Sequence, residues 1–251
     1  MSLNIKGNII SSTDITSVGV FKTKVNRDGL ELYLDSNDIN SYPGSGTVWY
    51  DLSGNGNNGT LTTMNSPSAG NTSGFDTTTG HMMFDRHIGG ADGTANNVVT
   101  FSSSASLLEC LSQNGMSMEM WLKITSPVCT AMSKMVGAWE IYYCTTLVHY
   151  TEGSASATLA GTINSSTYVN FHQLVITHDG INRRIYVNGV LNASDTSIPS
   201  GQSFSSMGLG AYPSGIYAFV GAIPIYRVYS RALNPYEIAE NFQATRGRFG
   251  I

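Results

Sequence analysis

The stretch that most restricts what this chain can fold into is a run of turn-forming residues between Ser41 and Thr60. From Asp51 to Gly59 the run holds three glycines, three asparagines, an aspartate and a serine. Glycine adopts positive φ without steric cost, and asparagine and aspartate bond to their own backbone in tight turns. The run therefore excludes a helix or a long strand. It follows an apolar strand over Leu30–Asp35, which predicts a compact loop at the rim of a sheet, where binding residues often lie.

Composition favours strands and turns over helices. The chain has 251 residues, of which only 12% are charged and 27 are glycine. The net charge of −4 argues against nucleic acid as the main partner, because phosphate binding needs a basic stripe. No apolar run approaches the roughly 18 residues of a membrane span, and the start lacks the pattern of a signal peptide. We therefore expect a soluble protein that is made and folded in a reducing cytoplasm.

The three cysteines match no zinc pattern and cannot all pair. Cys110 follows two leucines and is interpreted as a buried thiol. A bridge between Cys129 and Cys144 stays open as an alternative, against the expectation of folding in a reducing compartment.

Strand signals recur after residue 28. Met116–Ile124 places apolar residues at alternating positions and predicts a strand whose methionine side faces the core, with Glu119 on a solvated face. Phe171–His178 is apolar on both faces at its centre, which predicts a central strand. Asn188-Gly189 between two apolar runs predicts a type I′ hairpin. Pro224 lacks a ladder donor, so we expect it at a strand start, an edge or a bulge.

One convincing helix is predicted over residues 234–245. Asn234 serves as N-cap, Pro235 starts the first turn, and Glu237 completes a capping box. Ile238 and Phe242 lie four residues apart on the face that docks onto the sheet, and we expect Gly247 to end the helix. A shorter helical turn is predicted over residues 105–111.

The predicted organisation is an N-terminal arm, residues 1–28, followed by one domain, residues 29–251. The domain is predicted to be all-β, a two-sheet antiparallel sandwich of the jelly-roll type with one C-terminal helix. The arm is either a loosely attached first strand or a segment that docks onto a partner as an extra strand. Its apolar residues, which would make that contact, are Ile9, Ile10, Val20 and Phe21.

An ordered set of segments across residues 29–249 resembles the laminin-G-like, concanavalin A-like lectin/glucanase superfamily. These segments include residues 49–59, 118–122, 171–178, 184–189 and 221–233. The C-terminal end, from Tyr229 to Phe242 and then residues 246–250, is similar to copies in virion proteins of tailed phages, especially of marine and cyanobacterial phages. The resemblance implies two stacked antiparallel sheets, glycan or protein binding at the loop rims, and often a structural calcium ion.

The loop oxygens suit a calcium ion, which takes six to eight oxygen ligands. The candidate ligands are Asp51, Ser53, Asn55, Asn57 and Asp85. The family pattern often places an acid in the penultimate strand where this chain has Pro224, so one expected ligand is missing, and an ion-free turn held by side chains is the alternative.

Sugar sites combine aromatic platforms with amides and carboxylates. The candidate platforms are Trp139, Tyr142, Tyr212 and Tyr217, although such rings in a sandwich are more often core or cross-strand pairs. Catalysis is not indicated, because retaining glycosidases of this fold pair two carboxylates about 5 Å apart. Glu119 and Glu140 each stand alone. His172 and His178 share a strand face about 20 Å apart, too far for one metal.

These patterns favour a non-enzymatic structural protein of a bacteriophage virion, a capsid decoration, neck or fibre-associated component, that acts by protein–protein contacts and also touches host glycans. The partners would be other virion proteins, and the location the virion surface. The alternative is a free carbohydrate-binding module, and a glycoside hydrolase is a third reading. The sequence leaves the oligomeric state open.

Overall fold

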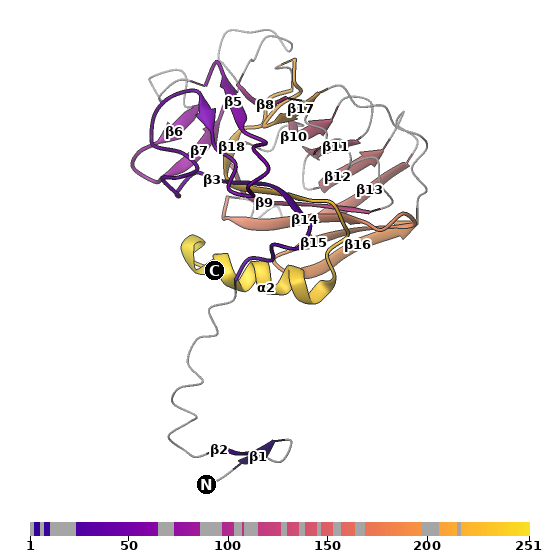
Figure 1. Ribbon diagram of the computed structural model, residues 1–251. Coiled ribbons are helices and arrows are strands. Elements are labelled where there is room, and N and C mark those ends of the chain that lie inside the picture. The colour runs from indigo at the N-terminus through magenta and orange to yellow at the C-terminus, as the bar shows by residue number, and fades with distance from the viewer. Residues whose placement is uncertain are drawn as a thin grey trace.

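The computed structural model describes residues 3–5, 8–10, 24–64, 73–85, 97–102, 107, 115–126, 130–135, 139–144, 147–152, 157–163, 169–196, 206–214 and 217–251. Two antiparallel sheets lie face to face, and a helix near the C-terminus lies against the outer side of one of them (Figure 1). The predicted all-β sandwich with one C-terminal helix is confirmed.

The first of the two large sheets, called sheet I, has the strand order β13-β12-β11-β10-β17-β8-β5-β4. Its strands are β4 (Val48–Trp49), β5 (Gly59–Thr62), β8 (Val98–Phe101), β10 (Thr130–Met135), β11 (Trp139–Cys144), β12 (Leu147–Glu152), β13 (Ala157–Thr162) and β17 (Met207–Leu209). The turn-rich run therefore lies at one edge of this sheet, where β4 pairs with β5.

The second large sheet, called sheet II, has the order β16-β15-β14-β9-β18-β7-β6, and β3 also pairs with β18. Its strands are β3 (Leu30–Asp35), β6 (Gly74–Asp76), β7 (His81–Phe84), β9 (Met116–Ile124), β14 (His172–His178), β15 (Asn182–Val187), β16 (Val190–Thr196) and β18 (Gly221–Tyr229). β14 is buried along its whole length between β9 and β15, as its two-sided apolar pattern predicts.

The main core fills the space between the two sheets, and the methionine stripe of β9 lies in it, as predicted. Met118 and Met120 are fully buried there. Trp139, Ile141 and Tyr143 of β11 enter the same core from sheet I. Because successive strand residues point to opposite faces, Glu140 and Tyr142 are left on the outer face of sheet I.

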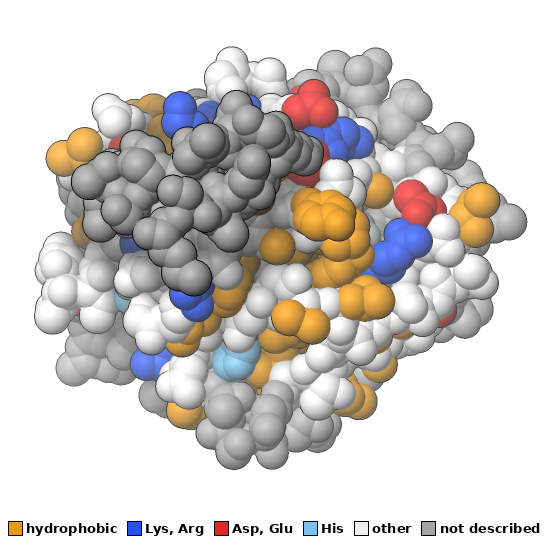
Figure 2. All heavy atoms as spheres, turned by 90° about the horizontal axis from the view of Figure 1, so that it is seen from below, with side chains coloured by type: hydrophobic (Ala, Val, Ile, Leu, Met, Phe, Trp, Pro, Cys, Tyr) orange, Lys and Arg blue, Asp and Glu red, His pale blue; other side chains and the backbone are white. Residues whose placement is uncertain are grey.

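A second core lies on the outer face of sheet II, under α2 (Pro235–Thr245) and the 3-10 turn η2 (Arg246–Phe249). The indole of Trp121 stacks on Phe249 at 4.3 Å and on Phe242 at 5.7 Å. Ile238 is fully buried, so α2 docks through the predicted face. Figure 2 looks at this side from below, where acidic and basic side chains are scattered on the described surface and do not gather into a stripe of one sign.

The prediction that Glu119 lies on a solvated face is wrong. Its side chain is 0% exposed, because α2 covers the face of sheet II that alternation assigned to water. Arg227 donates to its Oε1 atom at 2.7 Å and Gln173 donates to the same atom at 2.8 Å. Asn241 of α2 donates to its Oε2 atom at 2.7 Å. This buried carboxylate of β9 therefore bonds to residues of three other elements, β18, β14 and α2.

The predicted capping box of α2 is present. Asn234 accepts hydrogen bonds from the backbone of Tyr236 and Glu237, and Glu237 accepts from the backbone of Asn234. Such a cap contributes about 1 kcal/mol. The predicted end at Gly247 is wrong, since α2 ends at Thr245, η2 continues to Phe249, and Gly250 with a φ of 73° follows. Arg248 of η2 is bound to sheet II, because its side chain donates two bonds to Asp35 at 2.6 and 2.8 Å.

Two local predictions of backbone geometry are confirmed. Asn188 and Gly189 have φ angles of 52° and 79° and join β15 to β16 as a hairpin. Pro224 lies where the pairing of β18 with β9 shifts register between Ala222 and Ile225, so it occupies a bulge. Its carbonyl accepts the amide of Ser36 at 2.8 Å.

The N-terminal strands β1 (Leu3–Ile5) and β2 (Asn8–Ile10) pair with each other as a small hairpin, away from the sandwich (Figure 1). Ile9 and Ile10 lie in β2, whereas Val20 and Phe21 lie outside the described residues. Asn26 is already fixed to α2, since its amide donates to Asn241 and its side chain to Glu237, each at 2.8 Å. The last residues before position 28 thus contact the domain.

Cys144, at the end of β11, is disulfide-bonded. Cys110 and Cys129 lie outside the described residues, as does most of the predicted helical turn over residues 105–111, of which Leu107 alone is described and helical. β10 pairs with β11 up to Thr130 and Tyr143, the neighbours of positions 129 and 144. The bridge between Cys129 and Cys144 stays a prediction, because position 129 lies outside the described residues. No helix in the described part of the chain has the length and apolar character needed to cross a membrane.

Candidate functional site

The turn-rich loop is organised by the carboxylate of Asp51. One oxygen accepts the amides of Tyr33 and Ser53 at 2.9 and 2.8 Å. The other accepts the hydroxyl of Ser53 at 2.6 Å and the amide of Asn57 at 2.9 Å. An aspartate that accepts this many local donors fixes the path of a loop in place of regular secondary structure.

The asparagines of this loop hold it against β3. Asn57 donates through its side chain to the carbonyl of Glu31 at 2.7 Å, and Asn55 donates to the carbonyl of Leu30 at 3.1 Å. Gly54 and Gly56 have φ angles of 102° and 77°, so the turn needs glycine at both positions. The predicted compact loop at a sheet rim is therefore present.

This arrangement does not fit a calcium shell as it stands. Both oxygens of Asp51 already accept protein donors, and the described residues contain no group of three His, Cys, Asp or Glu side chains that could hold a metal ion. Asp85 follows β7 and is bound elsewhere, through its carbonyl, to the side chain of Asn97 at 2.5 Å. Calcium binding by Asp51, Ser53, Asn55, Asn57 and Asp85 stays a prediction that a metal titration would test.

Three of the four predicted glycan platforms gather on the outer side of sheet I. The hydroxyl of Tyr212, just after β17, donates to Oε2 of Glu140 on β11 at 2.7 Å. The rings of Tyr212 and Tyr217 lie 5.2 Å apart with an interplanar angle of 58°. Burial raises the pKa of Tyr212, and the nearby Glu140, Tyr217 and Tyr142 raise it further. These four residues, Glu140, Tyr142, Tyr212 and Tyr217, are called the tyrosine cluster.

Tyr217 is the most exposed member of the tyrosine cluster. Its side chain is 54% exposed, and its φ of 56° is uncommon for an aromatic residue. The next residues hold this conformation, since Ala218 is buried and the amide of Phe219 donates to the carbonyl of Gly210 at 2.6 Å. Backbone strain of this kind costs on the order of 1–3 kcal/mol and gathers at ligand sites. An exposed ring kept at that cost is suited to contact a ligand.

Trp139, the fourth predicted platform, lies elsewhere. Its side chain is 3% exposed and packs in the main core, so its ring face is not available for stacking. The alternation along β11 explains the difference, because it sends Trp139 inward and Glu140 outward. The hydrogen bond between Glu140 and Tyr212, 72 residues apart, could not be found from the sequence.

The two glutamates considered for catalysis, Glu119 and Glu140, are both engaged by other side chains. Glu119 is fully buried and engaged by Arg227, Gln173 and Asn241, so a substrate cannot reach it. Glu140 is half-buried and accepts from Tyr212. His172 and His178 are both buried in β14, and burial lowers the pKa of His172.

A sequence profile described as Laminin_G_3, concanavalin A-like lectin/glucanases superfamily, matches residues 92–239. The chain belongs to this superfamily. No curated protein sequence matches it.

Solved structures with this fold include binding domains of bacterial toxins. The binding domain of botulinum neurotoxin DC in complex with rat synaptotagmin II is 16% identical, with a TM-score of 0.62. The same domain in complex with SialylT is 14% identical, with a TM-score of 0.61. The binding domain of Paraclostridial Mosquitocidal Protein 1 is 13% identical, with a TM-score of 0.58.

These alignments cover 86–87% of this chain but only 52% of each toxin domain. The chain thus spans about half the length of these neighbours. At such identities the likeness shows a shared fold, and what the toxin domains bind is a property of those proteins.

Proposed function

We propose that this chain is a non-enzymatic, lectin-like binding protein of a bacteriophage virion surface. It serves as a capsid decoration, neck or fibre-associated component held by contacts with other virion proteins. It also binds host glycans through the tyrosine cluster. The observation that carries the glycan part is Tyr217, an exposed ring fixed in the left-handed region beside Tyr212.

A role in binding without turnover is supported by the state of the acidic residues. A glycosidase acid must reach the glycosidic oxygen, and its partner carboxylate must lie on the other side of the bond. Among the described residues, Glu119 is fully buried beneath α2, and Glu140 accepts a hydrogen bond from the hydroxyl of Tyr212. The buried ion pair of Glu119 with Arg227 explains this glutamate as a structural group.

The glycan role is supported by the chemistry of the tyrosine cluster. Tyr217 offers an apolar ring face for the C–H groups of a sugar, and tyrosine hydroxyls bond to sugar hydroxyls. The carboxylate of Glu140 fixes the hydroxyl of Tyr212 at 2.7 Å, so this part of the surface is organised before a ligand arrives. Preorganisation of this kind lowers the entropic cost of binding.

The virion part of the proposal rests on the sequence resemblance of residues 229–250 to tailed-phage virion proteins. The disulfide at Cys144 is compatible with this location, because disulfides persist on virion and cell surfaces. The N-terminal arm, which carries Ile9 and Ile10, would add contacts to a neighbouring virion protein.

A glycan array with the full chain tests the binding role. We expect binding that Tyr217→Ala weakens by about tenfold or more, since a lost stacking contact of about 1.4 kcal/mol corresponds to a factor of ten. Tyr236→Ala is the matched control, because this tyrosine is 84% exposed on α2, away from the cluster. Equal binding by the wild-type protein and Tyr217→Ala would contradict the assignment.

Removing the arm tests the virion role. A chain lacking residues 1–23 keeps the contacts of Asn26 with α2, so we expect an unchanged melting temperature. We also expect this chain to be lost from assembled particles, as measured by its recovery with purified virions. Normal incorporation without the arm would rule out a docking function for it.

A further inference from the structure

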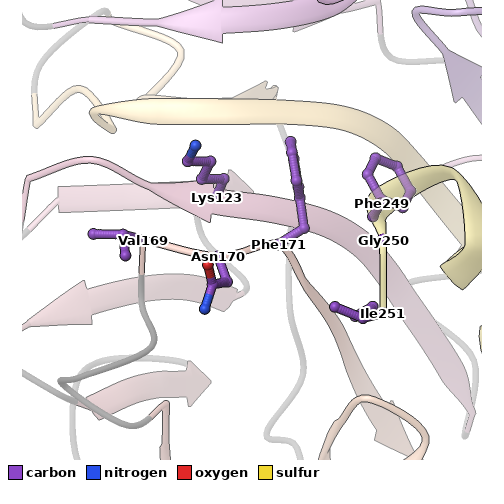
Figure 3. A pocket seen from close by; sticks show the side chains of 7 residues that line it. All are labelled: Lys123, Val169, Asn170, Phe171, Phe249, Gly250 and Ile251. Carbon is purple, nitrogen blue, oxygen red and sulfur yellow. The ribbon is translucent and has the colours of Figure 1, made fainter.

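A second concave site lies on the outer side of sheet II, where β9 ends beside the start of β14. It is a pocket of about 380 Å³, within the range of roughly 300–1,000 Å³ found for small-ligand sites. The residues that define it are Lys123, Val169, Asn170, Phe171, Phe249 and Ile251 (Figure 3). None of them belongs to the tyrosine cluster, which lies on the other sheet.

The pocket has an aromatic wall that is held rigidly. The rings of Phe171 and Phe249 lie 4.7 Å apart, and Phe249 stacks on the buried Trp121 at 4.3 Å. His81 packs edge-on against Phe171 at 4.8 Å. Arg248, next to Phe249, is fixed by its two bonds to Asp35. The wall is therefore formed before any ligand binds.

The pocket also has a positive charge, on Lys123. Leu122 of β9 pairs with His172 of β14, and Lys123 and Phe171 are their neighbours along the two strands. The side chain of Lys123 therefore lies beside that of Phe171 (Figure 3). Within the described part of the chain, no hydrogen bond or ion pair engages the ammonium group of Lys123. Burial lowers the pKa of the adjacent His81, and the charges of Arg248 and Lys123 lower it further against an opposite effect of Asp76. A lowered pKa favours the neutral form of His81, so Lys123 supplies the cation of the site.

The polar groups at the mouth are open to solvent. Asn170 is exposed and its side chain carries both a donor and an acceptor. Val169 is 47% exposed and Ile251 is 37% exposed, so a ligand can enter without a rearrangement of the strands. An aromatic wall, the ammonium group of Lys123 and an amide together suit a small ring that has an apolar face, hydroxyl groups and one carboxylate.

We infer that this pocket binds a carboxylate-bearing saccharide, such as a uronic acid unit of a surface polysaccharide. The carboxylate pairs with Lys123, the C–H face of the sugar packs on Phe171 and Phe249, and its hydroxyl groups bond to Asn170. This assignment rests on the proposed role in glycan binding and adds a site that selects acidic sugars, separate from the tyrosine cluster.

The test is an NMR titration of the full chain with glucuronate and galacturonate, matched against glucose and galactose. Each acid differs from its neutral partner in the carboxylate that replaces the hydroxymethyl group. We expect both acids to shift the side-chain amide signal of Asn170, with neutral sugars at least tenfold weaker. Lys123→Met should remove this preference, because it keeps the apolar stem and deletes the charge. Lys24→Met, at an exposed lysine away from the pocket, should not.

Three results would overturn the inference. They are equal binding of acids and neutral sugars, no binding of either acid, and wild-type binding of the acids by Lys123→Met. Tyr217→Ala separates this site from the proposed function. If Tyr217→Ala loses array binding while the uronates do not bind, the pocket fails alone. If the uronates bind through Lys123 while Tyr217→Ala changes nothing on the array, the tyrosine cluster fails alone.

Discussion

Replacing Glu119 with alanine is expected to lower the free energy of unfolding by about 3–5 kcal/mol, because the change leaves a buried cation without its partner. Arg227 is fully buried and forms its ion pair with Glu119 at 2.7 Å. The amide donors of Gln173 and Asn241 lose the same acceptor. Since Asn241 belongs to α2, the substitution also removes a polar contact between the helix and sheet II.

Urea denaturation followed by circular dichroism would measure this effect. Glu240→Ala is the matched control, because Glu240 is exposed on the same helix, and we expect a change within about 0.5 kcal/mol for it. The double variant Glu119→Leu, Arg227→Met should recover much of the loss, since an apolar pair needs no charge compensation. A loss below 1 kcal/mol in Glu119→Ala would show that the pair does not hold the helix layer.

The same layer links stability to the proposed acidic-sugar pocket. Phe249 supplies part of the pocket wall and belongs to η2, which follows α2 directly. η2 is fixed to the sheet by Arg248 and Asp35, whereas α2 is fixed by Asn241 and Glu119. Variants that release α2 should therefore weaken the pocket even though they do not touch it. The buried ion pair of Glu119 and Arg227 is thus expected to stabilise the pocket without contacting a ligand.

Local sequence rules predicted the parts of this fold that depend on neighbouring residues. The hairpin at Asn188-Gly189 follows from the preference of these residues for positive φ, and the capping box of α2 from the spacing of Asn234 and Glu237. The bulge at Pro224 follows from its missing amide hydrogen. In each case the determining contacts lie within a few positions along the chain.

The remaining features depend on contacts between distant segments. Alternation along β9 correctly separated Met118 from Glu119, but it could not reveal that a helix more than 100 residues later covers the second face. The tyrosine cluster has the same difficulty, since Glu140 of β11 bonds to Tyr212, which lies 72 residues later and just after β17. Trp139 cannot serve as a platform, because its ring is buried in the main core. Lys123 and Phe249 likewise line one pocket from distant parts of the chain.

Gly221→Ala is expected to destabilise the sandwich by more than about 3 kcal/mol, through overpacking together with backbone strain. Gly221 begins β18 between β9 and β7, and its φ is 154°. A Cβ atom there would lie 2.0 Å from the carbonyl oxygen of Lys123 and 2.9 Å from the ring of Phe219. The first neighbour is backbone within a central strand, so it cannot move aside without breaking the pairing of β9 and β18.

The melting temperatures of Gly221→Ala and Gly247→Ala would be compared by thermal unfolding. The comparison separates the clash at Gly221 from the effect that any glycine-to-alanine change has on stability. A Cβ atom at Gly247 meets nothing within 4 Å, so we expect that variant to match the wild-type protein or to be slightly more stable. Because Gly221 touches the carbonyl of Lys123, a residual folded fraction of Gly221→Ala should also lose the preference for uronates. Equal melting temperatures for the two variants would mean that β9 and β18 can separate at this point without cost, and would contradict the predicted clash at Gly221.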